Sequence, residues 1–68
     1  MKKQEPLTPH EIRLLQLLAD GHSFQSVADV LGVSLSTVVF YMRNIYGKLG
    51  VHSKIEAVIY ALRYGLIE

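Results

Sequence analysis

Residues 23–50 read SFQSVADVLGVSLSTVVFYMRNIYGKLG and contain two helix-like stretches separated by a very short break. Ser23 is suited to N-capping the first helix, and Gly32 is suited to the left-handed backbone conformation that ends it. Only Gly32 and Val33 precede Ser34, which is placed to cap the second helix. Because so short a connection makes two helices cross steeply, this spacing predicts a helix-turn-helix.

The same pattern of capping residues and terminal glycines recurs on both sides of the helix-turn-helix and predicts four helices in all. Each helix is expected to begin after a hydroxyl residue and to stop at a glycine, in the pairs Thr8 and Gly21, Ser23 and Gly32, Ser34 and Gly50, and Ser53 and Gly65. Glu11 lies three residues after Thr8 and Glu56 three residues after Ser53, which is the spacing of a reciprocal capping box. Strand-like alternation is missing from the sequence, so the expected fold class is all-α.

Apolar residues at helical spacing define the expected core. In the first three helices they are Ile12, Leu15 and Ala19 with Leu14 and Leu18 beside them, then Val27, Ala28 and Leu31, then Val38, Tyr41 or Met42, Ile45 and Leu49. Gly47 lies inside the third helix, where it costs about 1 kcal/mol relative to alanine. The fourth helix is apolar on almost every side, which one small core cannot cover, so a second copy of the chain is expected against it.

The net charge of +1 conceals an uneven distribution of charge along the chain. The segments before residue 34 and after residue 54 each carry one more acid than base. Residues 34–54 carry no acid and three cations, namely Arg43, Lys48 and Lys54. An anionic partner such as nucleic acid is therefore expected to meet this segment.

Composition excludes several function classes. A single domain of 68 residues leaves little room for an enclosed active site, and no Ser, His and Asp set or carboxylate pair has the setting that catalysis needs, so enzyme activity is not expected. The chain has no cysteine and its three histidines lie far apart, so neither a metal site nor a cofactor is expected. No segment approaches membrane-spanning length, and the expected location is the cytoplasm.

Residues 1–6 differ in composition from the rest of the chain, because they are polar and end in a proline. Such a stretch indicates either a free N-terminal arm or the end of a linker from an upstream receiver or sensor domain. The folded domain is expected to occupy residues 7–68.

Short motifs along almost the whole chain share an order and a spacing with one family. They are Leu7-Thr8-Pro9-His10-Glu11, Ala19-Asp20-Gly21, Val27-Ala28, Leu31-Gly32-Val33-Ser34, Thr37-Val38, Asn44-Ile45, Lys48-Leu49-Gly50-Val51 and Ala57. Together they closely resemble the LuxR-type helix-turn-helix domain of quorum-sensing and NarL/FixJ-like regulators, a four-helix fold. The combined pattern is far more specific than helical periodicity alone.

This resemblance implies that the third helix enters the major groove of duplex DNA and that the fourth helix pairs with its copy over a two-fold site. The residues expected to face bases are Val39, Phe40, Arg43 and Asn44, and those expected at phosphates are Ser34, Ser36, Thr37, Lys48 and Lys54. The residues expected at the dimer interface are Ile55, Ile59 and Leu62. Arg43 is the leading candidate for base recognition, because a guanidinium can donate to O6 and N7 of guanine together.

The chain departs from the family pattern at three positions. It has Val39 where the family usually carries lysine or another polar residue, Tyr41 where histidine is frequent, and Ser26 in place of an acid. Val39 and Phe40 suit thymine methyl groups, but exposed apolar neighbours on a helix also mark protein-binding surfaces. A DNA-binding transcription regulator is therefore the first hypothesis, and a protein-interaction module, acting as an adaptor or anti-regulator, is the alternative.

Overall fold

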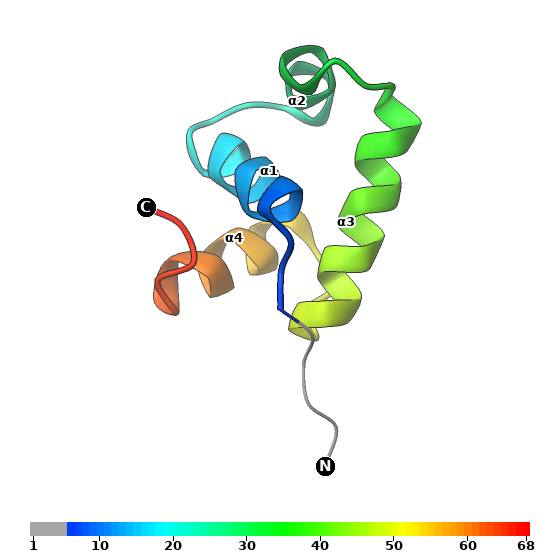
Figure 1. The fold of residues 1–68 in the computed structure, drawn as a ribbon. Coiled ribbons are helices and arrows are strands. Elements are labelled where there is room, and N and C mark those ends of the chain that lie inside the picture. The colour runs from blue at the N-terminus through cyan, green and yellow to red at the C-terminus, as the bar shows by residue number, and fades with distance from the viewer. Residues whose placement is uncertain (1–5) are drawn as a thin grey trace.

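Four helices make up the regular structure of residues 6–68, the part of the chain that this computed structural model describes (Figure 1). They are α1 (Pro9–Ala19), α2 (Phe24–Leu31), α3 (Leu35–Leu49) and α4 (Lys54–Arg63). The predicted all-α fold is thus confirmed. The predicted arm of residues 1–6 lies outside the described residues except for Pro6.

All four predicted N-caps are present. The side chains of Thr8, Ser23, Ser34 and Ser53 each accept a hydrogen bond from the backbone N–H three residues on. The capping box of Thr8 and Glu11 is complete. The second predicted box is wrong in one half, because Glu56 Oε1 accepts from the N–H of His52 at 2.8 Å rather than from that of Ser53. The backbone at Ser53 is more extended than at the other caps, with φ −147°, and this presents the preceding N–H to the carboxylate.

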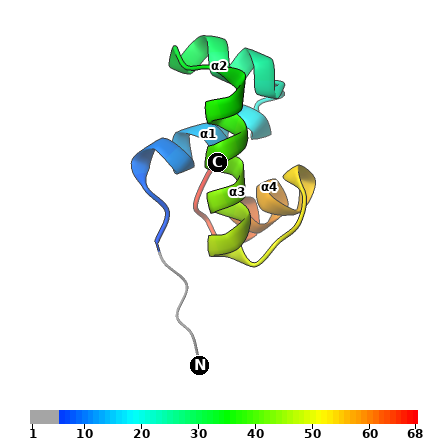
Figure 2. The same ribbon diagram turned by 90° about the vertical axis from the view of Figure 1, so that its right-hand side faces the viewer.

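The helix-turn-helix has the predicted short connection. Gly32 ends α2 in the left-handed conformation, with φ 71°, which a glycine adopts without steric cost. Between α2 and α3 the chain turns by 107°, so that α2 lies across the top of the upright α3 in both ribbon views (Figures 1 and 2). An angle of this size is typical of the motif.

The core lies where α1 packs against the other three helices. Its buried apolar residues are Leu14, Leu15, Leu18, Val27, Ala28, Val38, Met42, Ile45, Leu49, Ala57, Ala61 and Ile67. Three residues expected in the core, Ile12, Ala19 and Leu31, are only partly buried. In α1 the buried stripe is rotated, since Glu11 rather than Ile12 begins it.

No single helix within residues 6–68 is both long and apolar enough to span a membrane. Only α2 and α3 taken together pass by length and composition, and they are sharply bent at their junction.

Candidate nucleic-acid interface

The exposed side of α3 follows directly from the residues that the helix buries. Val38, Met42, Ile45 and Leu49 face the core, so the residues two positions earlier in each case point outward. We define the α3 outer face as these residues and their exposed neighbours, namely Ser36, Val39, Phe40, Arg43, Asn44 and Gly47. All of them are solvent-exposed, and the four predicted base-facing residues are among them. The structure therefore brings that predicted set together on one surface.

The first turn of α3 carries a cluster of hydroxyl groups. Ser34 Oγ accepts from the N–H of Thr37 at 3.2 Å and lies 2.9 Å from Thr37 Oγ1 and 3.1 Å from Ser36 Oγ. Because the first N–H groups of a helix lack carbonyl partners, this end also has a partial positive charge. Three of the predicted phosphate contacts thus share one site next to the α3 outer face, and Ser34 also caps the helix.

Arg43 is the cation at the centre of this surface. It is exposed, and within residues 6–68 the only ion pair is made by other residues, so its guanidinium retains all its donors. Asn44 is exposed beside it and offers an amide that can both donate and accept. The pair can therefore hydrogen-bond to base edges from the outer side of the helix.

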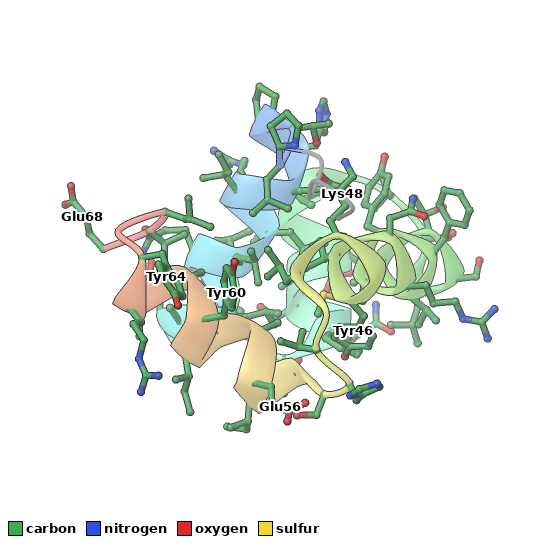
Figure 3. All side chains as sticks on the ribbon, turned by 90° about the horizontal axis from the view of Figure 1, so that it is seen from below. Tyr46, Lys48, Glu56, Tyr60, Tyr64 and Glu68 are labelled. Atoms are coloured by element: carbon green, nitrogen blue, oxygen red, sulfur yellow. The ribbon has the colours of Figure 1, made fainter. Side chains whose placement is uncertain are left out.

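Lys48 has a structural partner that the sequence did not reveal. Its Nζ lies 2.8 Å from Glu11 Oε1 and 3.4 Å from the carbonyl oxygen of Pro6, and its side chain is only 18% exposed. Figure 3 places Lys48 and Tyr46 on opposite sides of α3, with Lys48 on the side of the N-terminal end of α1. The expected free charge of residues 34–54 is corrected accordingly, because Lys48 is neutralised by Glu11. Its phosphate contact stays a prediction.

Glu11 is the buried end of this pair, at 4% exposure. Burial raises the pKa of its carboxyl group, but the hydrogen bond from Lys48, the hydrogen bond from the backbone N–H of Thr8 and the nearby positive charge together outweigh burial and leave the pKa lowered. Glu11 therefore caps α1 and ties it to the last turn of α3. The first role follows from the local sequence, whereas the second does not, because the two partners are 37 residues apart.

Lys54 begins α4 on the side of α2. Its Nζ lies 5.3 Å from the centre of the Phe24 ring, at the distance of a cation–π contact, and the residue remains exposed. Of the three cations expected to attract an anion, Arg43 and Lys54 are thus the two that keep an unmatched charge.

The fourth helix leaves a second apolar surface in solvent. Its buried residues are the small Ala57 and Ala61, whereas Ile55, Ile59 and Leu62 are 63%, 49% and 47% exposed. These three, which we call the α4 outer face, recur at the spacing of one helical stripe. The rings of Tyr60 and Tyr64 lie beside each other on a different side of the helix, with centres 4.6 Å apart and planes tilted by 41° (Figure 3).

The remaining departures from the family pattern have local partners. Ser26 Oγ lies 2.6 Å from His22 Nδ1, which joins α2 to the loop before it. Tyr41 is half-buried and lines an open cavity of about 270 Å³ together with His10, Arg13, Val30, Leu31 and Val33. Among the residues that the structure describes, no three His, Asp or Glu side chains are grouped to hold a metal ion.

Comparison with known proteins identifies the family. The sequence pattern GerE, described as "Bacterial regulatory proteins, luxR family", matches residues 5–61. The response regulator protein VraR of Staphylococcus aureus is 39% identical over the whole of this chain, which covers 34% of VraR. The chain therefore spans about a third of the length of that relative.

Solved structures agree with this assignment. The transcription factor GerE superposes with a TM-score of 0.85 at 32% identity, covering 91% of this chain and 92% of GerE. The response regulator ChrA of a heme-sensing two-component system superposes with a TM-score of 0.90 at 36% identity, and the match covers 97% of this chain and 33% of ChrA. Vibrio cholerae VqmA, in complex with ligand and DNA, superposes with a TM-score of 0.83 at 33% identity, and the match covers 97% of this chain and 29% of VqmA. The chain belongs to the LuxR family of bacterial regulatory proteins, and its four helices form the helix-turn-helix DNA-binding domain of that family.

Proposed function

We propose that this chain binds duplex DNA as a homodimer, with α3 in the major groove and α4 paired with its copy. The observation that carries the proposal is the α3 outer face, which combines Arg43, Asn44 and Ser36 in a segment without any acid. The adjacent hydroxyl cluster adds donors where a phosphate oxygen would be stabilised by the helix dipole. A relative with this fold, VqmA, was solved in complex with DNA.

Each surface has a distinct role in this proposal. Val39, Phe40, Arg43 and Asn44 face base edges, while Ser34, Ser36, Thr37 and Lys54 position the phosphate backbone. Lys48 contributes less to phosphate binding, because its charge is already matched by Glu11. The α4 outer face then supplies the two-fold contact that aligns two copies of α3 with two half-sites.

The domain is proposed to work within a longer regulator. VraR and ChrA are response regulators roughly three times the length matched by this chain. An upstream receiver or sensor domain would then control when two copies of the DNA-binding domain come together. A regulator that acts on bacterial DNA works in the cytoplasm.

An NMR titration tests the DNA-binding surface directly. The isotope-labelled domain is titrated with a mixed-sequence duplex at low and then moderate salt, and each amide is followed. We expect shifts concentrated between Ser34 and Lys54 that fade as salt rises. Shifts confined to other surfaces, or no shifts at low salt, would overturn the proposal.

The salt dependence of binding to a selected operator gives a second, quantitative test. If Lys54 and the partly matched Lys48 together account for about one to two neutralised phosphates per subunit, log Kd against log salt should have a slope with a magnitude of about 2 to 4 for the dimer. Lys54→Ala should weaken all sequences alike and flatten this slope, whereas Arg43→Ala should relax the preference at one base position. Equal effects of the two substitutions would contradict these roles.

Phe40 is 59% exposed, and so large an exposed apolar side chain also suits a protein partner. The alternative to DNA binding is therefore a protein-interaction module that uses the same face. Val39→Lys distinguishes the two functions. It should abolish a protein contact made through this face, but it should strengthen non-specific DNA binding if the partner is DNA.

A further inference from the structure

Two adjacent residues of the α3 outer face are apolar. Val39 is 37% and Phe40 59% exposed, so the core of the domain does not account for either apolar side chain. The Phe40 ring has one aromatic neighbour, Tyr41, at 6.3 Å, and most of its area faces solvent. This pair is therefore available to cover an apolar group of a partner.

Polar groups lie on both sides of this pair along the helix. Ser36 lies one turn before Phe40 and Arg43 one turn after it, on the same stripe. No acid lies anywhere between residues 34 and 54, so no carboxylate of α3 itself repels an anion. An apolar pair between a hydroxyl and a guanidinium matches a surface where methyl groups alternate with hydrogen-bonding atoms and phosphates flank both sides. The major groove of DNA has this composition.

Only one group in the major groove is strongly apolar, the C5 methyl of a pyrimidine. Polar base atoms covered by valine and phenylalanine would lose their hydrogen bonds to water without replacement, which is unfavourable. A methyl group, in contrast, gains from leaving water. The same side chains therefore discriminate in favour of methylated pyrimidine positions and against the others.

Resting on the proposed DNA binding, we infer that Val39 and Phe40 select pyrimidine C5 methyl groups in each half-site, next to the base that Arg43 contacts. Phe40 and Arg43 are three residues apart, about 4.5 Å along the helix axis. Successive base pairs are about 3.4 Å apart, so the methyl group lies one or two base pairs from the Arg43 position. Thymine and 5-methylcytosine both present this methyl group.

Replacement of thymine by deoxyuridine isolates the methyl group, because it leaves base pairing and charge unchanged. A two-half-site operator is first selected from a random duplex pool, and each thymine is then replaced in turn. We expect one or two adjacent positions per half-site at which each lost methyl weakens binding about four-fold, or about fifteen-fold when both half-sites are changed. A second set of duplexes compares cytosine with 5-methylcytosine at those positions. Tighter binding to the 5-methylcytosine duplex than to the thymine duplex would identify methylated DNA as the preferred source.

Variants assign the effect to the residue pair. Val39→Ala and Phe40→Ala should still bind the operator but should lose most of the thymine-to-uracil difference. Val30→Ala is the matched control, since Val30 is also apolar and 45% exposed but lies on α2 rather than on α3. It should retain the full difference.

The outcomes separate this inference from the function on which it rests. An operator that is bound equally well with thymine and uracil at every position would overturn the inference and leave DNA binding intact. A difference that survives in both alanine variants would also overturn it, because another residue would then contact the methyl group. Failure to bind any duplex would instead remove the proposed function.

Discussion

α3 and α4 both leave large apolar side chains in solvent, but the groups that surround those side chains differ. On α3, Val39 and Phe40 lie between Ser36 and Arg43, so apolar and hydrogen-bonding groups alternate. On α4, Ile55, Ile59 and Leu62 form an unbroken stripe, and the charged residues of the helix lie outside it. Exposure alone therefore does not indicate what a helix face binds. The distribution of polar groups within the face is more informative.

This difference matches two kinds of partner. A surface that alternates apolar and polar groups complements DNA, which presents methyl groups, base edges and phosphates within a few ångströms. A continuous apolar stripe complements another apolar stripe, and a second copy of the same helix provides one by symmetry. The comparison can be tested by placing the same charged residue on each face in turn.

Ile59→Asp has the largest expected effect. A carboxylate in the middle of the α4 outer face would be buried without a partner in the dimer, so two copies should no longer associate. Because the second half-site then binds independently, affinity for a two-half-site operator should fall about 100-fold. Affinity for a single half-site should not change. Sedimentation and fluorescence anisotropy measure both quantities.

Phe40→Asp is the reciprocal variant and serves as the control. It places the same carboxylate on the α3 outer face, where it should abolish binding to single half-sites while the dimer persists. If either variant affected both dimerisation and half-site binding equally, the division of roles between the two helices would be wrong.

Lys48→Met has the next largest expected effect. It tests whether Lys48 stabilises the fold rather than belonging to the DNA-binding surface. Its removal leaves the carboxylate of Glu11, which is only 4% exposed, without a cation. Breaking such a pair should lower the free energy of unfolding by about 2 kcal/mol, less than for a fully buried pair because Lys48 is partly exposed. Urea denaturation measures this loss. The matched variant Lys54→Met should cost little stability, and equal losses in both variants would contradict the structural role of Lys48.

What the sequence could predict depended on how local the interaction is. The caps at Thr8, Ser23, Ser34 and Ser53 were all confirmed, because each depends on residues within one turn. The inner stripe of α3 was also confirmed, since Val38, Ile45 and Leu49 are buried, and of the two alternatives Tyr41 and Met42 it is Met42 that is buried.

Interactions between distant segments could not be predicted. Glu11 and Lys48 are far apart in sequence, and each had a sufficient local explanation, as a capping residue and as a charge near a helix C-terminus. α4 posed a different difficulty. Because this helix is apolar on almost every side, the spacing of its apolar residues does not indicate which side is buried. The structure shows that the core takes the small residues Ala57 and Ala61, which lets α4 pack closely and leaves the large side chains outside.

The same ion pair predicts a smaller effect, on acid stability. The pKa of Glu11 is lowered from its ordinary value of 4.5, so its contribution to stability is present above that value and is lost as pH falls through the lowered pKa. Glu11→Gln should therefore flatten the loss of stability on the acid side, as measured by urea midpoints between about pH 6 and pH 3. Glu68→Gln changes an exposed carboxylate and should follow the wild type. A Glu11→Gln profile as steep as that of the wild type would rule out this contribution.

Gly47→Ala has the smallest expected effect and tests the α3 outer face beyond Arg43. Gly47 is exposed inside the helix, and a Cβ atom added there would meet nothing within 4 Å. Alanine should therefore raise the free energy of unfolding by about 1 kcal/mol and the Tm by about 4 to 8 °C, because it favours the helical backbone. Since Gly47 lies on the same stripe as Ser36, Phe40 and Arg43, the added methyl group would point toward bound DNA. A more stable variant with weaker operator binding would show that the DNA approaches this turn closely. A more stable variant with unchanged binding would end the DNA contact surface at Arg43 and Asn44.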